Sequence, residues 1–229
     1  SSDLSCYTPM PVTACGSVRW SVKTGTDSDA PLVNMASAND TTIGILGLLA
    51  APTSLPPSSR IKPVETSVYV VDATLTMYRM TDDSDYHVVL ADSNGNTMIG
   101  ELPHPDCVGA TSPFRKAIVS ARETFNSNLR ATSTFKSVAV PVRVYGVGFF
   151  DSIHGQTGVA PNGIELHPIL KIEFNPTASA STNTMFSLAN DADRVFNWAE
   201  VTYPNFFPGS YVAGFLAPYS YRYYAQTST

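Results

Sequence analysis

The stretch Val142–Phe174 constrains the fold of this chain more than any other part of its sequence. Its two ends are rich in β-branched and aromatic residues, which favour half-buried strands. The part between them contains several glycines, Pro161 and many polar side chains, so we predict a strand, a long polar loop and a second strand. Two of the four histidines, His154 and His167, lie near the ends of this loop. The polar residues most suited to chemistry are therefore concentrated here.

Three more predicted strands precede this stretch, and in the first of them β-forming residues alternate with polar ones. An Asn-Gly turn within residues 92–96 joins the second and third of them as a hairpin. Residues 112–129 predict a helix, with Ser112 as its N-cap and Pro113 at its first position. The order β-β-β-α-β-β matches an OB-fold-like five-stranded barrel, with a β-sandwich as the alternative. The three strands are Val64–Tyr78, Tyr86–Ala91 and Thr97–Leu102.

The segments on either side of the predicted barrel differ from it in composition. Prolines interrupt the N-terminal segment, which we expect to form an extended arm with a short helix at Thr41–Leu49 and a weak strand at Val18–Lys23. The C-terminal segment is dense in aromatic residues and predicts a helix followed by a hairpin. The predicted parts are the arm (1–60), the barrel (61–174), a polar linker (175–185) and a small aromatic module (186–229).

The composition indicates an extracellular setting and excludes some partners. Only 14% of the residues are charged, and the net charge of −5 argues against nucleic-acid binding, which needs clustered Lys and Arg. No apolar run reaches the length of a transmembrane helix. Because the sequence starts at Ser1 without a leader, we expect a secreted protein whose signal peptide has been removed.

Three cysteines leave one thiol over if a single disulfide forms. The first two, Cys6 and Cys15, are close enough in sequence to close a small loop, and we favour this pair. The alternative is Cys15 with Cys107, which would attach the N-terminal segment to the main body. No Cys-x-x-Cys spacing occurs, so a cysteine-based zinc site is not expected.

Several motifs resemble a family of secreted bacterial proteins of unassigned function. They are VKTGTD (22–27), PVETSVYVVDATL (63–75), DSDYHVVLAD (83–92) and, above all, GVGFFDSIHGQTGVAPNGIELHPIL (146–170). The resemblance implies a bacterial, extracellular protein with a compact OB-like domain and no established reaction. The tail, with FNWAE, YP, FPG and YRYY, resembles an aromatic module of other secreted bacterial proteins. That module continues past RYY, so we expect a neighbouring chain to complete it here.

The loop after the fourth predicted strand offers a candidate ligand site and a candidate metal site. In an OB topology the acidic turn at 81–85 can lie near this loop. A metal-dependent hydrolase or nuclease would use carboxylates and imidazoles together as ligands. The competing interpretation, which we favour, is that these side chains make structural hydrogen bonds and that no metal or other cofactor binds. The candidate catalytic residues are His154, His167, Glu165 and Asp151, and the candidate ligand-loop residues are His154, Gly155, Gln156, Thr157, Gly158 and Asn162.

The functional hypothesis that we favour is a secreted, non-catalytic structural or binding protein that self-associates as a homo-oligomer or filament. An ordered arm with few regular elements and a tail rich in aromatic rings both suit an interface. Binding of an extracellular glycan or small ligand is a further alternative. The predicted interface residues are Trp198, Tyr203, Phe206, Phe207, Tyr211, Tyr221, Tyr223 and Tyr224.

Overall fold

The computed structural model describes Val12, residues 14–177, and the backbone of residues 214–216 and 221–223. The chain divides into two compact units, Ser1–Pro176 and Thr177–Thr229. In the second unit, β7 (Gly214–Leu216) pairs antiparallel with β8 (Tyr221–Tyr223). The predicted helix and interface side chains of the tail lie outside the described residues, as does Cys6.

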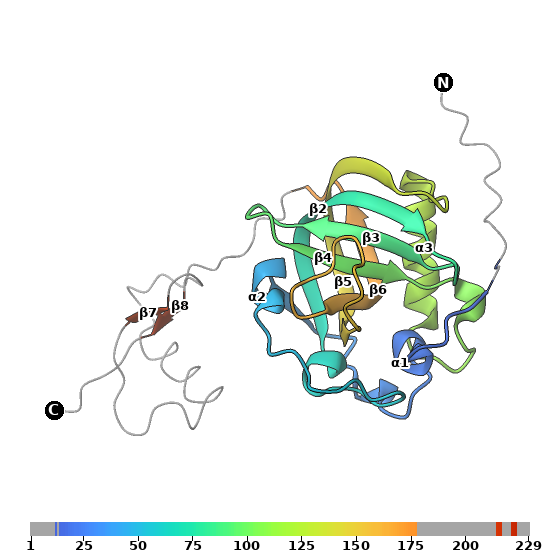
Figure 1. The fold of residues 1–229 in the computed structure, drawn as a ribbon, viewed down its shortest axis with the longest axis horizontal. Helices are drawn as coiled ribbons and strands as arrows, with labels where there is room; N and C mark the ends of the chain where they lie inside the picture. Colours follow the sequence, from blue (N-terminus) through green and yellow to red (C-terminus); the bar gives the residue numbers. More distant parts are fainter. Residues whose placement is uncertain (1–11, 13, 178–213, 217–220, 224–229) are drawn as a thin grey trace. The chain divides into compact units, whose positions relative to one another are not determined.

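Five strands of the first unit close into a ring, which is the predicted OB-fold-like barrel (Figure 1). The ring runs β2-β3-β4-β6-β5 and returns from β5 to β2. Only β4 and β6 pair parallel within it, and α3 (Arg115–Asn128) follows β4 in the sequence. The strands are β2 (Val68–Met80), β3 (Tyr86–Ala91), β4 (Thr97–Leu102), β5 (Lys136–Phe150) and β6 (Ile164–Phe174).

Alternation of side chains along these strands separates the core from the outer face. Apolar residues such as Val88, Leu102 and Leu166 are fully buried in one core cluster, to which α3 adds Phe125. Burial of one such side chain contributes about 1.5–3 kcal/mol. The residues next to them in β3, β4 and β6 therefore lie on the outer face of the barrel, where the polar site is found.

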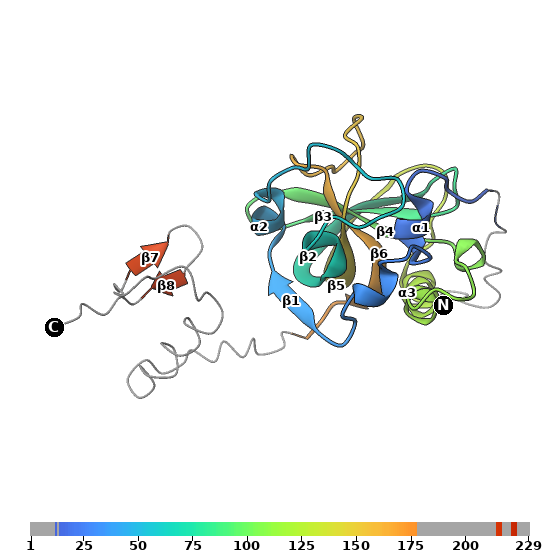
Figure 2. The same cartoon turned by 90° about the horizontal axis from the view of Figure 1, so that it is seen from below.

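Residues 14–60, within the expected N-terminal arm, carry four short elements and pack on the barrel through buried charged side chains. Arg19 donates to Glu65 and to the Phe150 carbonyl, and Arg60 forms an ion pair with Asp27. The helix α2 is confirmed, and Figure 2 shows it across the barrel from α1 and α3. The elements are α1 (Trp20–Thr24), η1 (Ala30–Leu32), β1 (Ala38–Thr41), which pairs parallel with β2, and α2 (Ile43–Gly47).

Three local predictions were wrong in whole or in part. The segment Val18–Lys23 is not a strand, because α1 turns Lys23 towards the barrel and leaves no strand partner for this segment. The helix predicted over residues 112–129 begins only at Arg115, since Ser112 caps a preceding turn by accepting from the Phe114 N–H at 3.1 Å. The strand predicted at Val64–Tyr78 begins only at Val68, because the residues after Pro63 form the 3₁₀ turn η2 (Val64–Thr66). A further 3₁₀ turn is η3 (Pro105–Cys107).

The disulfide joins Cys15 to Cys107, so the favoured pairing of Cys15 with Cys6 was wrong. Folding brings the Cα atoms of Cys15 and Cys107 to 5.4 Å, although they are 92 positions apart in the sequence and no local pattern predicts their pairing. The bond holds the start of the described chain against η3. A structural disulfide indicates an oxidising compartment. Among the described residues, no helix is long and apolar enough to span a membrane.

Candidate functional site

Three adjacent strands place polar side chains side by side on the outer face of the barrel. His87 of β3 lies opposite Glu101 of β4 in the strand register. Glu165 of β6 lies opposite Ile99 of β4, two residues before Glu101. The hairpin and the parallel β4–β6 pairing therefore bring one imidazole and two carboxylates from distant parts of the sequence to one patch.

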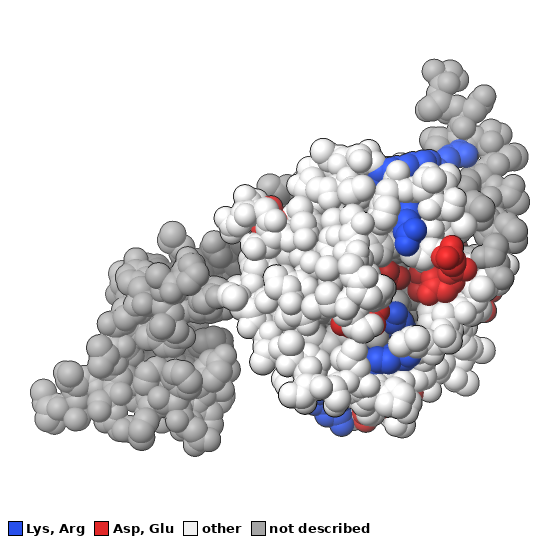
Figure 3. Space-filling view, in the orientation of Figure 1, with Lys and Arg blue, Asp and Glu red and all other residues white. Residues whose placement is uncertain are grey.

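A pocket of about 800 Å³ lies over this patch. The acidic turn between β2 and β3 and the loop between β5 and β6 border it, as expected from the OB topology, and α1 supplies another wall. OB-folds bind their ligands on this face and with these two loops. Figure 3 shows acidic and basic side chains gathered around a hollow on one face. The ionisable lining residues are Lys23, Arg79, Asp82, Asp83, His87, Glu101, Asp151, His154 and Glu165.

His87 connects the pocket floor to the loop above it. Its Nδ1 lies 3.0 Å from Glu101 Oε1, and its Nε2 lies 2.9 Å from the Thr157 carbonyl oxygen. An ionised carboxylate and a carbonyl can only accept, so both ring nitrogens donate and the ring is cationic. Burial would lower the pKa of His87, but the Glu101 carboxylate outweighs it and raises the pKa.

Lys23 of α1 brings a second cation into the pocket. Its Nζ lies 3.1 Å from Asp151 Oδ2 and 5.3 Å from the centroid of the Phe149 ring. Burial alone would lower the pKa of Lys23, but the carboxylates of Glu165, Asp151 and Glu101 raise it above its ordinary value. Burial likewise opposes ionisation of Asp151, yet Lys23 lowers the pKa of that carboxyl.

Behind the pocket floor, His167 lies between two carboxyl groups and is completely buried. Its Nδ1 is 3.2 Å from Glu165 Oε1, and its Nε2 is 3.6 Å from Asp85 Oδ2. Burial lowers the pKa of His167 to about 3, so this ring is neutral at pH 7. Burial, together with the nearby Glu101 carboxylate, raises the pKa values of both Asp85 and Glu165 well above their ordinary range.

The loop predicted to contact ligand is shaped mainly by its own hydrogen bonds. Gln156 accepts from the His154 N–H and donates to the Ser152 carbonyl, and Asn162 donates to the Leu46 and Leu49 carbonyls. Its glycines include Gly155 and Gly158, which have positive φ angles, so turn geometry explains these glycines without a bound anion. Gly155, Gln156 and Thr157 also line the pocket, whereas Gly158 and Asn162 support the loop.

The four candidate catalytic residues are divided among different partners. Glu165 and His167 contact each other, Asp151 binds Lys23, and the exposed His154 ring places Nδ1 2.9 Å from the Ser152 carbonyl oxygen. Among the described residues, the group with ligand atoms close enough to hold a metal ion is Asp85, Glu101 and His167, without His154.

Sequence reasoning did not identify Glu101 and Lys23 as site residues. The Asn-Gly turn alone would not have paired Glu101 with His87. A two-residue loop at Asn94-Gly95 would place His87 opposite Leu102, whereas the observed register pairs His87 with Glu101. Lys23 carries no sequence signal either, because only the tertiary packing of α1 brings it to the pocket.

No family model and no curated protein matches this sequence. The fold is distantly similar to two structures of an asparaginyl-tRNA synthetase from Entamoeba histolytica, one in complex with asparaginyl-adenylate, with 6% and 9% identity and TM-scores of 0.34 and 0.32. Each alignment covers 84% of this chain and 43% of that protein. A protein assigned as an aspartyl-tRNA synthetase from Leishmania major Friedlin gives 16% identity and a TM-score of 0.36 over 62% of this chain and 21% of that protein. The chain spans less than half of these proteins, and the likeness assigns no family or function.

Proposed function

We propose that the barrel is a binding module that holds a neutral polyhydroxyl ligand, such as a saccharide, in the pocket over β3, β4 and β6. The observation that carries this proposal is the position of the pocket. It occupies the outer face and the two loops with which OB-folds bind oligosaccharides and oligonucleotides. The proposal keeps glycan binding as the function but places the ligand on the barrel and not on the aromatic tail.

The mixed charges of the pocket favour hydroxyl groups over phosphates. Carboxylates outnumber lysine and arginine in the lining, whereas a phosphate backbone needs clustered cations. A hydroxyl both donates and accepts, so it suits acceptors such as Asp83 and donors such as Lys23. Arg79 Nε is buried without a hydrogen-bond partner among the described residues, and its guanidinium lies 5.0 Å from the Phe135 ring centroid. Arg79 also lines the pocket, so its other guanidinium N–H groups are available to donate to a ligand oxygen.

The proposed setting is extracellular and bacterial, as the sequence resemblance implies and as the disulfide favours. Self-association through the arm and the aromatic tail also stays a prediction. Its interface residues in the tail lie outside the residues whose side chains the structure describes.

A panel of neutral oligosaccharides, titrated into the full chain by calorimetry, tests the ligand proposal. We expect at least one saccharide to bind and Arg79→Gln to weaken it about 10–100-fold, the effect of one lost charge-assisted hydrogen bond. Arg143→Gln is the matched control, because Arg143 pairs with Asp72 and Asp40 and does not line the pocket. Binding of a single-stranded oligonucleotide in place of every saccharide would contradict the proposal.

A further inference from the structure

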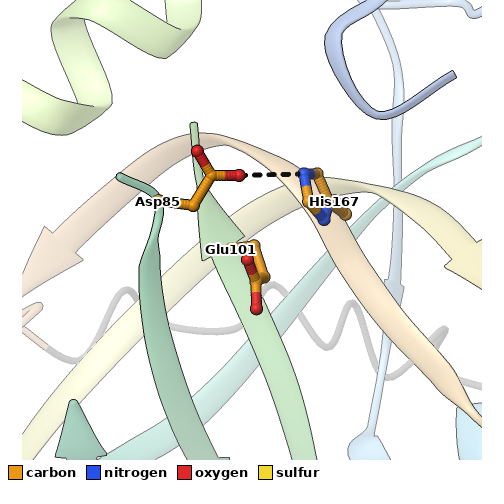
Figure 4. A group of neighbouring side chains, drawn as sticks. All are labelled: Asp85, Glu101 and His167. Carbon is orange, nitrogen blue, oxygen red and sulfur yellow. Dashed lines mark ion pairs between the residues drawn. The ribbon is translucent and has the colours of Figure 1, made fainter. Parts of the chain in front are cut away.

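Asp85, Glu101 and His167 bring three potential metal ligands together at the base of the pocket. One carboxylate oxygen from each acid and one nitrogen of the imidazole lie within 4.8 Å of one another. Asp85 precedes β3, Glu101 lies in β4 and His167 in β6, so the barrel itself fixes their spacing. Figure 4 shows the Asp85 carboxylate directed at the His167 ring, with Glu101 beside both.

Two potential ligand atoms of these residues are buried without a hydrogen-bond partner among the described residues. Asp85 Oδ2 and His167 Nε2 belong to side chains with 0% exposure, and neither atom donates or accepts a hydrogen bond there. They face each other across 3.6 Å, which is too long for a hydrogen bond. Buried polar groups are nearly always paired, so a pair of unsatisfied atoms in one place indicates a missing partner.

Each of the three ligands is also held from behind by a second group. Glu165 Oε1 lies 3.2 Å from His167 Nδ1, the His104 N–H donates to Asp85 Oδ1, and His87 Nδ1 donates to Glu101 Oε1. Metal-binding histidines almost always donate their other N–H to a carboxylate or carbonyl, and ligating carboxylates are likewise hydrogen-bonded. With its proton on Nδ1, His167 presents the Nε2 lone pair to Asp85.

The surroundings offer both charge compensation and access for a cation. Glu101 lines the pocket, so an ion can reach the site from the pocket side, while Asp85 and His167 lie behind it. When the two ligand acids are included, five carboxyl groups meet three cationic side chains here. The groups that interact there are the carboxyls of Asp83, Asp85, Glu101, Asp151 and Glu165 and the cations Lys23, His87 and Arg122.

We propose that Asp85, Glu101 and His167 bind one divalent transition-metal ion, with Glu165 as the positioning residue of His167. One imidazole with two carboxylates suits Zn²⁺ or Mn²⁺, whereas Mg²⁺ and Ca²⁺ prefer oxygen ligands alone. The proposal does not depend on the saccharide, because metal binding is measured without any ligand in the pocket.

The test is calorimetric titration of the chelator-treated full chain with Mn²⁺ and Zn²⁺, together with thermal unfolding with and without each ion. We expect one ion per chain and a higher melting temperature in its presence. Asp85→Asn keeps the acceptor for the His104 N–H and should weaken binding about tenfold or more. Glu165→Gln should weaken it about 10–100-fold by loosening His167. The matched control His154→Gln alters an exposed imidazole of the same pocket and should bind as the wild type does.

A second measurement keeps the proposal falsifiable if the buried variants fail to fold. Crystals of the wild-type chain soaked in Mn²⁺ should give an anomalous peak between Asp85 and His167. No binding by the wild type, a peak elsewhere, or equal affinity in a folded Asp85→Asn variant would each overturn the proposal. Loss of binding in His154→Gln would also overturn it, by assigning the ion to an exposed histidine.

Discussion

At the scale of single residues, Glu65 attaches the N-terminal segment to the barrel. Its two oxygens accept four hydrogen bonds, two from Arg19 and one each from the Ile61 and Phe150 N–H groups. The Arg19 and Glu65 side chains are 3% and 0% exposed, so this pair is shielded from water. Removal of one partner leaves a buried charge uncompensated, which costs far more than loss of a surface pair.

We therefore expect Glu65→Gln to lower the free energy of unfolding by about 3–5 kcal/mol, as measured by urea denaturation. The control is Glu173→Gln, whose partner Lys171 is largely exposed and whose loss should cost at most about 1 kcal/mol. Equal effects of the two substitutions would show that the buried pair does not secure this segment.

A second prediction at the scale of single residues concerns the pH dependence of stability that Asp151 produces. Lys23 lowers the pKa of Asp151 in spite of burial, so the folded state favours the ionised carboxylate more than the unfolded state does. This stabilisation is present above the ordinary carboxyl pKa of about 4 and is lost as the pH falls through the lower pKa of the folded state.

Urea unfolding between pH 2 and pH 7 checks this prediction by comparing the wild type with Asp151→Asn. At pH 7 the variant should be less stable by about 1 kcal/mol, a modest value because the pair is partly exposed. At the acid end the two stability curves should converge. A difference that is constant across the pH range would contradict the assigned role of the carboxylate charge.

At the scale of elements, the loop between β5 and β6 depends on Gly158 for both backbone geometry and space. Gly158 and Gly155 have φ angles of 86° and 88°, but a Cβ on Gly158 would lie 2.5 Å from Val89, whereas a Cβ on Gly155 meets nothing within 4 Å. The two glycines thus share one conformational requirement and differ in packing.

Gly155→Ala should cost about 1–2 kcal/mol for the left-handed conformation, and Gly158→Ala should cost a further 1–3 kcal/mol, approximately, for the clash with Val89. Thermal and urea unfolding of both variants measure the difference. Gly158→Ala should also weaken saccharide binding, because Gly158 adjoins Thr157, whose carbonyl accepts a hydrogen bond from His87. Equal costs would mean that the loop moves away from Val89 freely.

The elements also show which sequence signals are reliable. Strands β3 and β4 were predicted with their observed bounds, because runs of β-forming residues end there at the turn residues 92–96. The five residues of α1 are too few for periodicity to separate helix from strand, and their conformation follows from packing around Arg19 and Lys23. The short strand β1 was missed because it is mostly exposed, so its sequence carries no alternation.

At the scale of the whole molecule, the order of elements was enough to predict the barrel, whereas the site needed three-dimensional contacts. Glu165 and His167 were named from the sequence, and the acidic turn that contains Asp85 was expected near them, but Glu101 of β4 was not. The pairing of β4 with β6 brings Glu101 next to these residues, and no local sequence pattern predicts that pairing. Long-range pairings of charged residues are therefore the part of this site that could not be predicted from the sequence.

The last prediction concerns the Cys15–Cys107 disulfide, which links distant parts of the chain beside the pocket. Cys15 lines the pocket together with Gly16 and Val18, so the bond also holds one of its walls. The double variant Cys15→Ser, Cys107→Ser should lose about 2–5 kcal/mol of stability, since the link closes a long loop in the unfolded chain. Reduction of the wild type should lower its melting temperature to that of the variant, and reductant should not affect the variant further. An unchanged melting temperature of the reduced wild type would mean that packing of α1 and Arg19 alone holds this wall in place.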